Sequence, residues 1–154
     1  MIHTINMRKI CGCIPTSLIT LSLLLSISGK ACVNGSEQLV LEQNKIRIVF
    51  SEEEAGPLKI AIDALKKDIL SVVDTDPMLV GEMGQDHSMV EIVIVNRASG
   101  HLEVPSNHRK DLDGFESHRV YADPENKRIY LEGNDLRGTI YAIYTFSEEI
   151  MGVP

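Results

Sequence analysis

The chain has 154 residues, with 15 lysines and arginines against 22 aspartates and glutamates, which gives a net charge of −7 at neutral pH. This length is typical of one domain. The acidic balance argues against a nucleic-acid partner and against anionic membrane surfaces, because phosphate groups attract a basic surface.

Residues 1–31 have the layout of a secretory signal peptide. A short basic segment at 7–9 precedes an apolar run at 14–27 (IPTSLITLSLLLSI), and small residues follow before Cys32. The apolar run is shorter than the roughly 20 residues that a membrane span requires, and Pro15 interrupts it. We therefore expect an exported protein (periplasmic, cell-surface or extracellular) without a membrane span.

Removal of this signal would leave Cys32 as the first residue of the mature chain. Lipidation of Cys32 is one alternative, but Gly29 and Lys30 match a lipoprotein signal poorly, and simple export is the other. Cys32 would be the only cysteine left, which excludes an intramolecular disulfide and a cysteine-based metal site. Because residues 1–31 contain three bases and no acid, the mature chain would have 12 basic and 22 acidic residues and a net charge of −10.

The first elements of the mature chain are a strand and a helix. Residues 32–44 form a polar lead-in with one apolar patch at 39–41, and the alternation in 45–50 (KIRIVF) predicts a half-buried strand. Gly56 and Pro57 open a helix that runs to about residue 73, since proline is favoured at the first helical position. Its apolar stripe, which must lie on a sheet, consists of Leu58, Ala61, Ile62, Leu65, Ile69 and Val72.

A central strand follows this helix. An Asp-Pro pair at 76–77 ends the helix, and residues 78–80 are compatible with a short strand. Residues 90–95 (VEIVIV) are nearly all apolar, which predicts a strand covered on both faces. The polar segments 81–88 and 97–113 before and after this strand are expected to be loops.

The last elements are two strands and a helix. Residues 115–122 (FESHRVYA) and 128–131 (RIYL) are predicted strands, and the DPEN turn at 123–126 separates them. A helix begins at a cap in 134–135 and runs to about residue 151. The order β-α-β-β-β-β-α predicts an α/β (α+β) fold, a mixed β-sheet with two main helices packed on it.

The turn GNDLRGT at 133–139 is the most distinctive short segment. Its two glycines and Thr139 match the frame of a phosphate-binding loop, but the lysine that holds the phosphates is missing. The spacing of Gly133 and Gly138 also fails the G-x-G-x-x-G pattern of dinucleotide-binding folds. A nucleotide site is therefore a weak interpretation.

Two other interpretations of the turn remain open. In the structural one, Asp135 caps the helix, Gly138 lets the helix approach the sheet, and Arg137 pairs with a nearby acid such as Asp135 or Glu132. In the functional one, Asn134, Asp135 and Arg137 present a polar edge to a neighbouring domain or a sugar. The second is attractive because α/β folds bind ligands at the carboxyl ends of their strands.

Nothing in the sequence singles out a catalytic centre. Glycoside hydrolysis requires two carboxylates about 5 to 10 Å apart, and 22 acids do not identify such a pair. Glu91 is the one acid in a buried run, and exposure at a sheet edge would explain it equally well. The histidines lack metal-ligand spacing, and His118 is expected to be structural. We therefore expect no catalytic residue, metal or cofactor in this chain.

Residues 133–154 (GNDLRGTIYAIYTFSEEIMGVP) resemble the end of the N-terminal domain of the xylan α-glucuronidases, glycoside hydrolase family 115. That family typically shows Gly-Ser-Asp-Lys-Arg-Gly-Thr-Ile-Tyr-Gly-Ile-Tyr, then a Ser-Glu pair and Gly-Val. Residues 115–117 resemble the family's Trp-Glu-Ser-Phe-type strand, and residues 58–73 resemble its first helix. The resemblance covers most of 45–154, and similar domains precede the barrel in other α-glucuronidases and in β-hexosaminidases (domain 2).

The resemblance implies a non-catalytic domain of an exported glycoside hydrolase that acts on plant polysaccharide of the xylan type. The domain would pack on a catalytic barrel that lies outside the 154 residues, so the chain alone is expected to be inactive. Leu136 replaces the family's lysine, which leaves the specificity for a uronic acid open, and Arg137 is the neighbouring cation. The implied substrate or barrel-edge contacts are Asn134, Asp135 and Arg137, with Gly133 and Gly138 as structural turn residues. The alternative is a free-standing carbohydrate-binding or scaffold module without hydrolase activity.

Overall fold

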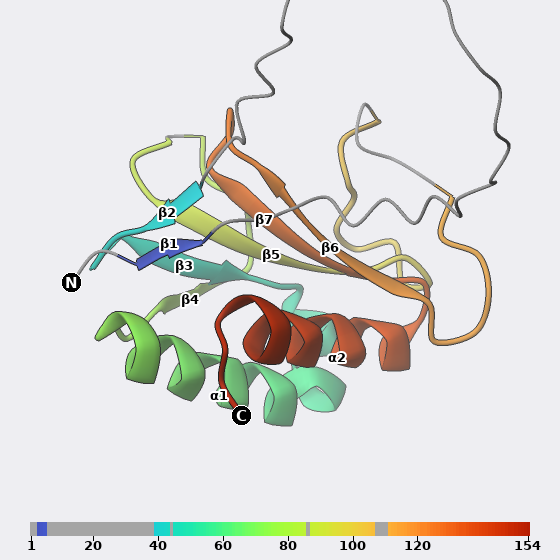
Figure 1. The fold of residues 1–154 in the computed structure, drawn as a ribbon. Coiled ribbons are helices and arrows are strands. Elements are labelled where there is room, and N and C mark those ends of the chain that lie inside the picture. The colour runs from blue at the N-terminus through green and yellow to red at the C-terminus, as the bar shows by residue number, and fades with distance from the viewer. Residues whose placement is uncertain (1–2, 6–38, 44, 86, 107–110) are drawn as a thin grey trace, which may run out of the picture.

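The computed structural model describes residues 3–5, 39–43, 45–85, 87–106 and 111–154 of the chain. Its centre is a five-stranded sheet with the strand order β4-β3-β5-β7-β6 (Figure 1). The strands are β3 (Ile46–Val49), β4 (Met78–Val80), β5 (Val90–Asn96), β6 (His118–Asp123) and β7 (Arg128–Gly133).

The sheet is mixed, as the sequence predicts. β4, β3, β5 and β7 run parallel to one another, and β6 pairs with β7 in the antiparallel direction through the turn that joins them. Every residue of β5 is buried, which confirms that this strand is central and covered on both faces.

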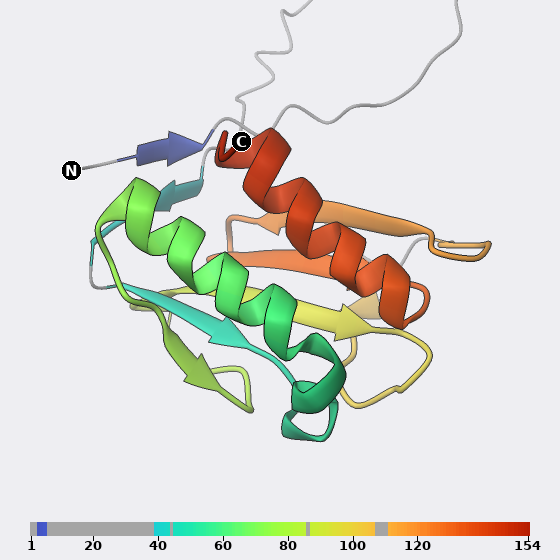
Figure 2. The same ribbon diagram turned by 90° about the horizontal axis from the view of Figure 1, so that it is seen from below.

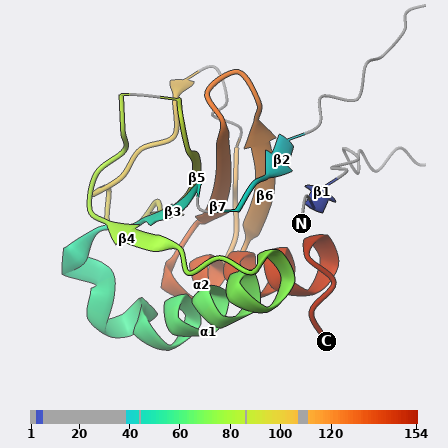
Figure 3. The ribbon, with the colours of Figure 1, turned by 90° about the vertical axis from the view of Figure 1, so that its left-hand side faces the viewer.

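Two helices cover one face of the sheet (Figures 2 and 3). α1 (Ala55–Val73) follows a short 3-10 turn, η1 (Glu52–Glu54), and α2 (Leu136–Thr145) continues into a π-helical turn, η3 (Phe146–Ile150). The predicted mixed sheet with two main helices is therefore confirmed.

The apolar stripe of α1 lies on the sheet at nearly the predicted positions. Leu58, Leu65 and Ile69 are completely buried, and the stripe ends with a buried Val73 and a partly buried Val72. Burial of six such side chains contributes on the order of 10 kcal/mol before conformational entropy is subtracted. This contact fixes α1 against the sheet.

A second, two-stranded sheet pairs β1 (His3–Ile5) with β2 (Leu39–Leu41) in the antiparallel direction. Leu39 and Leu41, which the sequence assigns to the polar lead-in, are buried in the main core. Apart from β1, the predicted signal segment lies outside the described residues, so the signal peptide stays a prediction. Within the described ranges, no helix is long and apolar enough to cross a membrane.

The predicted strand at 115–122 begins three residues later than expected, at His118. Gly114 and Glu116 have φ angles of 100° and 59°, which a continuing strand does not allow. The backbone N–H of Glu116 instead donates to the carboxylate of Asp135. A long-range contact therefore converts the start of this apparent strand into a turn.

Two glycines allow α2 to lie directly against the end of the sheet. A Cβ atom on Gly133 would lie 2.0 Å from the backbone nitrogen of Thr139, and a Cβ on Gly138 would lie 2.5 Å from the carbonyl oxygen of Ser117. Both clashes are with backbone, which cannot rotate away as a side chain can. The assignment of Gly133 and Gly138 as structural turn residues therefore has a steric reason.

Substitution of Gly138 by alanine tests this reason. The new methyl group must push α2 away from Ser117, so Gly138→Ala should destabilise the fold by about 1–3 kcal/mol, as overpacking of a closed contact does. Gly56→Ala is the matched control, because a Cβ on Gly56 meets nothing within 4 Å and alanine favours a helix. Urea unfolding of both variants measures the difference. Equal stability of the two variants would contradict the steric account.

Candidate functional site

The predicted site residues lie together where β7 ends and α2 begins. Asn134 follows β7, Asp135 is the N-cap of α2, and Arg137 is in the first turn of that helix. The turn at 114–117, which precedes β6, lies beside them. The structure thus brings the predicted contacts to one edge of the domain, at the carboxyl end of a central parallel strand.

Asp135 has an internal, structural role. One carboxylate oxygen accepts the N–H of Gly138 at 2.8 Å, and the other accepts the N–H of Glu116 at 2.9 Å. These two hydrogen bonds, from Gly138 first and Glu116 second, hold the pKa of Asp135 below its usual range. The residue caps α2 and also attaches the preceding turn to the helix.

Asn134 binds the same turn. Its backbone N–H donates to the carbonyl oxygen of Ser117 at 2.9 Å, and its side-chain nitrogen donates to the carbonyl oxygen of Gly114 at 3.0 Å. Asn134 and Asp135 therefore form hydrogen bonds within the domain. Through these bonds they position the neighbouring exposed side chains.

Arg137 is the exposed member of the predicted set, with 60% of its side chain accessible. One terminal nitrogen lies 2.8 Å from Glu116, and the other donates to the hydroxyl of Tyr141 at 3.3 Å. The guanidinium also lies 5.6 Å from the ring centre of Phe115. Arg137 thus pairs with a nearby acid, as predicted, but this acid is Glu116 and not one of the two examples, Asp135 and Glu132.

We call Phe115, Glu116, Arg137 and Tyr141 the Arg137 surface. Phe115 is 76% exposed, an unusual position for a large apolar ring, and Tyr141 is 37% exposed. An exposed guanidinium beside two aromatic rings can donate hydrogen bonds to a carboxylate or hydroxyl while the rings contact an apolar face. The sequence alone could have identified Tyr141 as a neighbour of Arg137, because residues four apart on a helix lie on the same face.

His118 is held between β6 and α2. One ring nitrogen lies 3.0 Å from the hydroxyl of Thr145, and the other lies 3.3 Å from the carbonyl oxygen of Glu116. These contacts agree with the structural role expected for this histidine.

Within the part of the chain that the structure describes, no group of three or more histidine, cysteine or acidic residues is arranged to bind a metal ion.

The opposite face of the sheet contains a row of alternating charges. Neighbouring positions on β3, β5, β7 and β6 are Arg47, Glu91, Arg128 and Asp123. Glu91 is only 2% exposed, and its carboxylate lies 3.0 Å from Arg47 and 2.7 Å from Arg128. Glu91 is therefore a buried acid of a central strand with two cationic partners, and exposure at an edge does not account for it.

A second buried acid lies on the same face, toward the carboxyl ends of the strands. Glu132 on β7 is completely buried and pairs with Arg97 at 2.5 Å and with Arg119 on β6. Between the two acids, the rings of Tyr121 and Tyr130 stack with their centres 5.0 Å apart. Burial raises the pKa of both phenols, because removal from water disfavours the ionised form.

Comparisons with known proteins leave the family open. No protein-family model and no curated protein matches the chain. Among solved structures, the fold is similar to part of a GH138 enzyme targeting pectin rhamnogalacturonan II, with a TM-score of 0.44 and 13% sequence identity. The similar region covers 71% of this chain and 14% of that enzyme chain. The resemblance to family 115 therefore stays a prediction.

The lowered pKa of Asp135 predicts how its contribution to stability depends on pH. A carboxylate whose pKa is lower in the folded state stabilises the fold above its unfolded pKa of about 3.9, and this stabilisation is lost as the pH falls through the folded pKa. Asp135→Ala should therefore lower Tm at pH 7. The difference from the unsubstituted chain should shrink as the pH is lowered below about 4.

Thermal unfolding followed by circular dichroism over this pH range gives the comparison. Asp113→Ala is the control, since Asp113 is an exposed aspartate in the preceding loop. It should leave Tm nearly unchanged at every pH. A Tm difference for Asp135→Ala that is as large at low pH as at pH 7 would show that the ionised carboxylate is not the stabilising group.

Proposed function

We propose that the chain is a non-catalytic N-terminal domain of an exported glycoside hydrolase that resembles the xylan α-1,2-glucuronidases. In this proposal the domain packs on the catalytic barrel of the parent enzyme and helps to shape its sugar site during hemicellulose breakdown. The signal-like residues 1–31 support export, with lipidation at Cys32 as the alternative to a soluble exported form.

The Arg137 surface is the observation that carries this proposal. It lies within the segment that resembles family 115, and it places an exposed cation between Phe115 and Tyr141. Such a surface can contact a sugar, whose hydroxyl and carboxylate groups accept hydrogen bonds from a guanidinium. Asn134 and Asp135 contribute by holding the turn that carries Phe115.

The environment of Leu136 bears on the sugar class. Leu136 is partly buried and packs against the core, whereas the next residue, Arg137, faces solvent. The side chain of a lysine at position 136 would leave the backbone toward the core. Arg137, in contrast, already presents its positive charge at the surface. We infer that Arg137 provides the positive charge that a lysine at position 136 would otherwise contribute. An acidic sugar therefore stays among the candidate ligands.

A free-standing carbohydrate-binding module is the second candidate, and the high exposure of Phe115 favours it. The two candidates differ in the affinity of the chain for sugar. A domain that completes a site on a barrel needs only weak contacts of its own, whereas a free-standing module must bind its ligand without help.

The test uses the purified chain with xylo-oligosaccharides that carry glucuronic acid. We expect no hydrolysis, and we expect millimolar binding with NMR shifts that include Phe115, Arg137, Tyr141 and their neighbours. Arg137→Gln should weaken this binding by about two- to fivefold, the effect of one exposed ion pair. Lys67→Gln, which removes an exposed cation from α1, is the matched control and should have no effect.

Three results would change the conclusion. Turnover of the oligosaccharide by the chain alone would contradict a non-catalytic role. Micromolar binding would favour the free-standing module. Equal binding by Arg137→Gln and Lys67→Gln would remove the Arg137 surface from the sugar site.

A further inference from the structure

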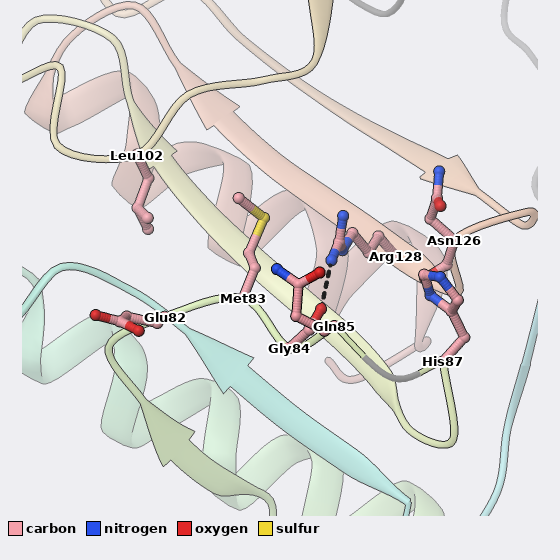
Figure 4. Close-up of a pocket in the computed structure, with 8 residues that line it drawn as sticks. All are labelled: Glu82, Met83, Gly84, Gln85, His87, Leu102, Asn126 and Arg128. Atoms are coloured by element: carbon pink, nitrogen blue, oxygen red, sulfur yellow. Dashed lines mark hydrogen bonds between the residues drawn. The ribbon is translucent and has the colours of Figure 1, made fainter.

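A pocket of about 510 Å³ opens on the face of the sheet opposite the helices, near the start of β7 (Figure 4). It lies between the loop that joins β4 to β5, the loop after β5, and the turn between β6 and β7. Its volume is in the range of small-molecule sites, which is roughly 300–1,000 Å³. The residues that determine its chemistry are Met83, Gln85, His87, Leu102, Asn126 and Arg128.

The base of this pocket is held in place by Gly84. Its N–H donates to Glu91 at 2.6 Å, and its carbonyl oxygen accepts from Arg128 at 2.9 Å, the bond drawn in Figure 4. A Cβ atom at position 84 would lie 2.4 Å from a terminal nitrogen of Arg47, so a larger residue would require the Arg47 guanidinium to shift. The pocket is therefore preformed, which lowers the entropic cost of binding a ligand.

The walls combine apolar and neutral polar groups. Met83 and Leu102 are partly buried and belong to the small apolar cluster on this face. The side chain of Gln85 makes no hydrogen bond within the described part of the chain, and one ring nitrogen of His87 lies 3.2 Å from the carbonyl oxygen of Asn126. The amide of Gln85 can donate and accept at once, as a sugar hydroxyl also does. Apolar side chains suit the C–H face of a sugar ring.

The charges of the pocket favour a neutral ligand. Arg128 already donates to the carboxylate of Glu91, and the row that contains them has as many acids as bases. The pocket therefore presents no excess positive charge. Glu82 adds an exposed carboxylate to the wall, and the whole chain has a net charge of −7. An anionic ligand would be repelled by both.

We propose that this pocket binds a neutral pyranose unit, free or as part of an oligosaccharide chain. The site shares no residue with the Arg137 surface, and it does not rest on the proposed function. In this site, Gln85 and His87 bind hydroxyl groups, and Met83 and Leu102 line the sugar ring.

The experiment is an NMR titration of the full chain with xylotriose and cellotriose, two neutral chains of pyranose rings. At millimolar concentrations, at least one of them should shift the amide signals of Met83, Gly84, Gln85 and His87. Sodium glucuronate and glycerol, the anionic and the acyclic probe, should leave these signals in place. Gln85→Ala should weaken binding by about two- to tenfold, the effect of one or two hydrogen bonds.

Two further variants provide the control. His87→Ala should weaken binding similarly, whereas His101→Ala removes an exposed histidine that does not line the pocket and should have no effect. The proposal is overturned if neither trisaccharide shifts the pocket signals, if glucuronate or glycerol shifts them equally, or if both alanine variants, folded by their NMR spectra, bind like the unsubstituted chain. Shifts at the Arg137 surface do not enter this result, so the two sites are tested separately.

Discussion

The structure depends on two buried carboxylates that lie between arginines on neighbouring strands. The helices cover only one face of the sheet, so the other face must be closed by loops. Glu91 and Glu132 make this possible because each binds two guanidinium groups, and Glu91 also accepts the N–H of Gly84 from the loop above it. Removal of one partner from such a buried group typically costs about 3–5 kcal/mol. The loop-covered face is thus fixed by specific polar contacts as well as by apolar burial.

This arrangement separates two surfaces with different chemistry. The pocket rests on the Glu91 ion pairs and has balanced charge, whereas the Arg137 surface lies at the start of α2 and presents an exposed cation with aromatic neighbours. Asp135 and the two glycines of the turn hold the second surface in place but do not form its exposed part.

The regular elements could be predicted because their periodicity is local. The alternation in β3, the apolar run of β5 and the stripe of α1 each identify an element and its buried side without knowledge of the rest of the chain. The role of Glu91 could not be predicted, because Arg47 and Arg128 are 44 and 37 residues away from it. The exposed ring of Phe115 was missed for the same reason, since its contact with Arg137 spans 22 residues. Long-range polar contacts leave no periodic pattern in the sequence. Because both candidate sites are formed by such contacts, the sequence does not reveal how either site is formed.

Hydrogen exchange at the backbone amide of Gly84 tests most directly whether the buried carboxylates fix the loop-covered face. If Glu91 accepts this N–H, the amide should exchange as slowly as those of β5, although it lies in a loop. The amide of His87 in the same loop, whose residue is exposed, provides the fast reference. Exchange of Gly84 as fast as that of His87 would contradict the account, because the loop would then open without disturbing the ion pairs beneath it.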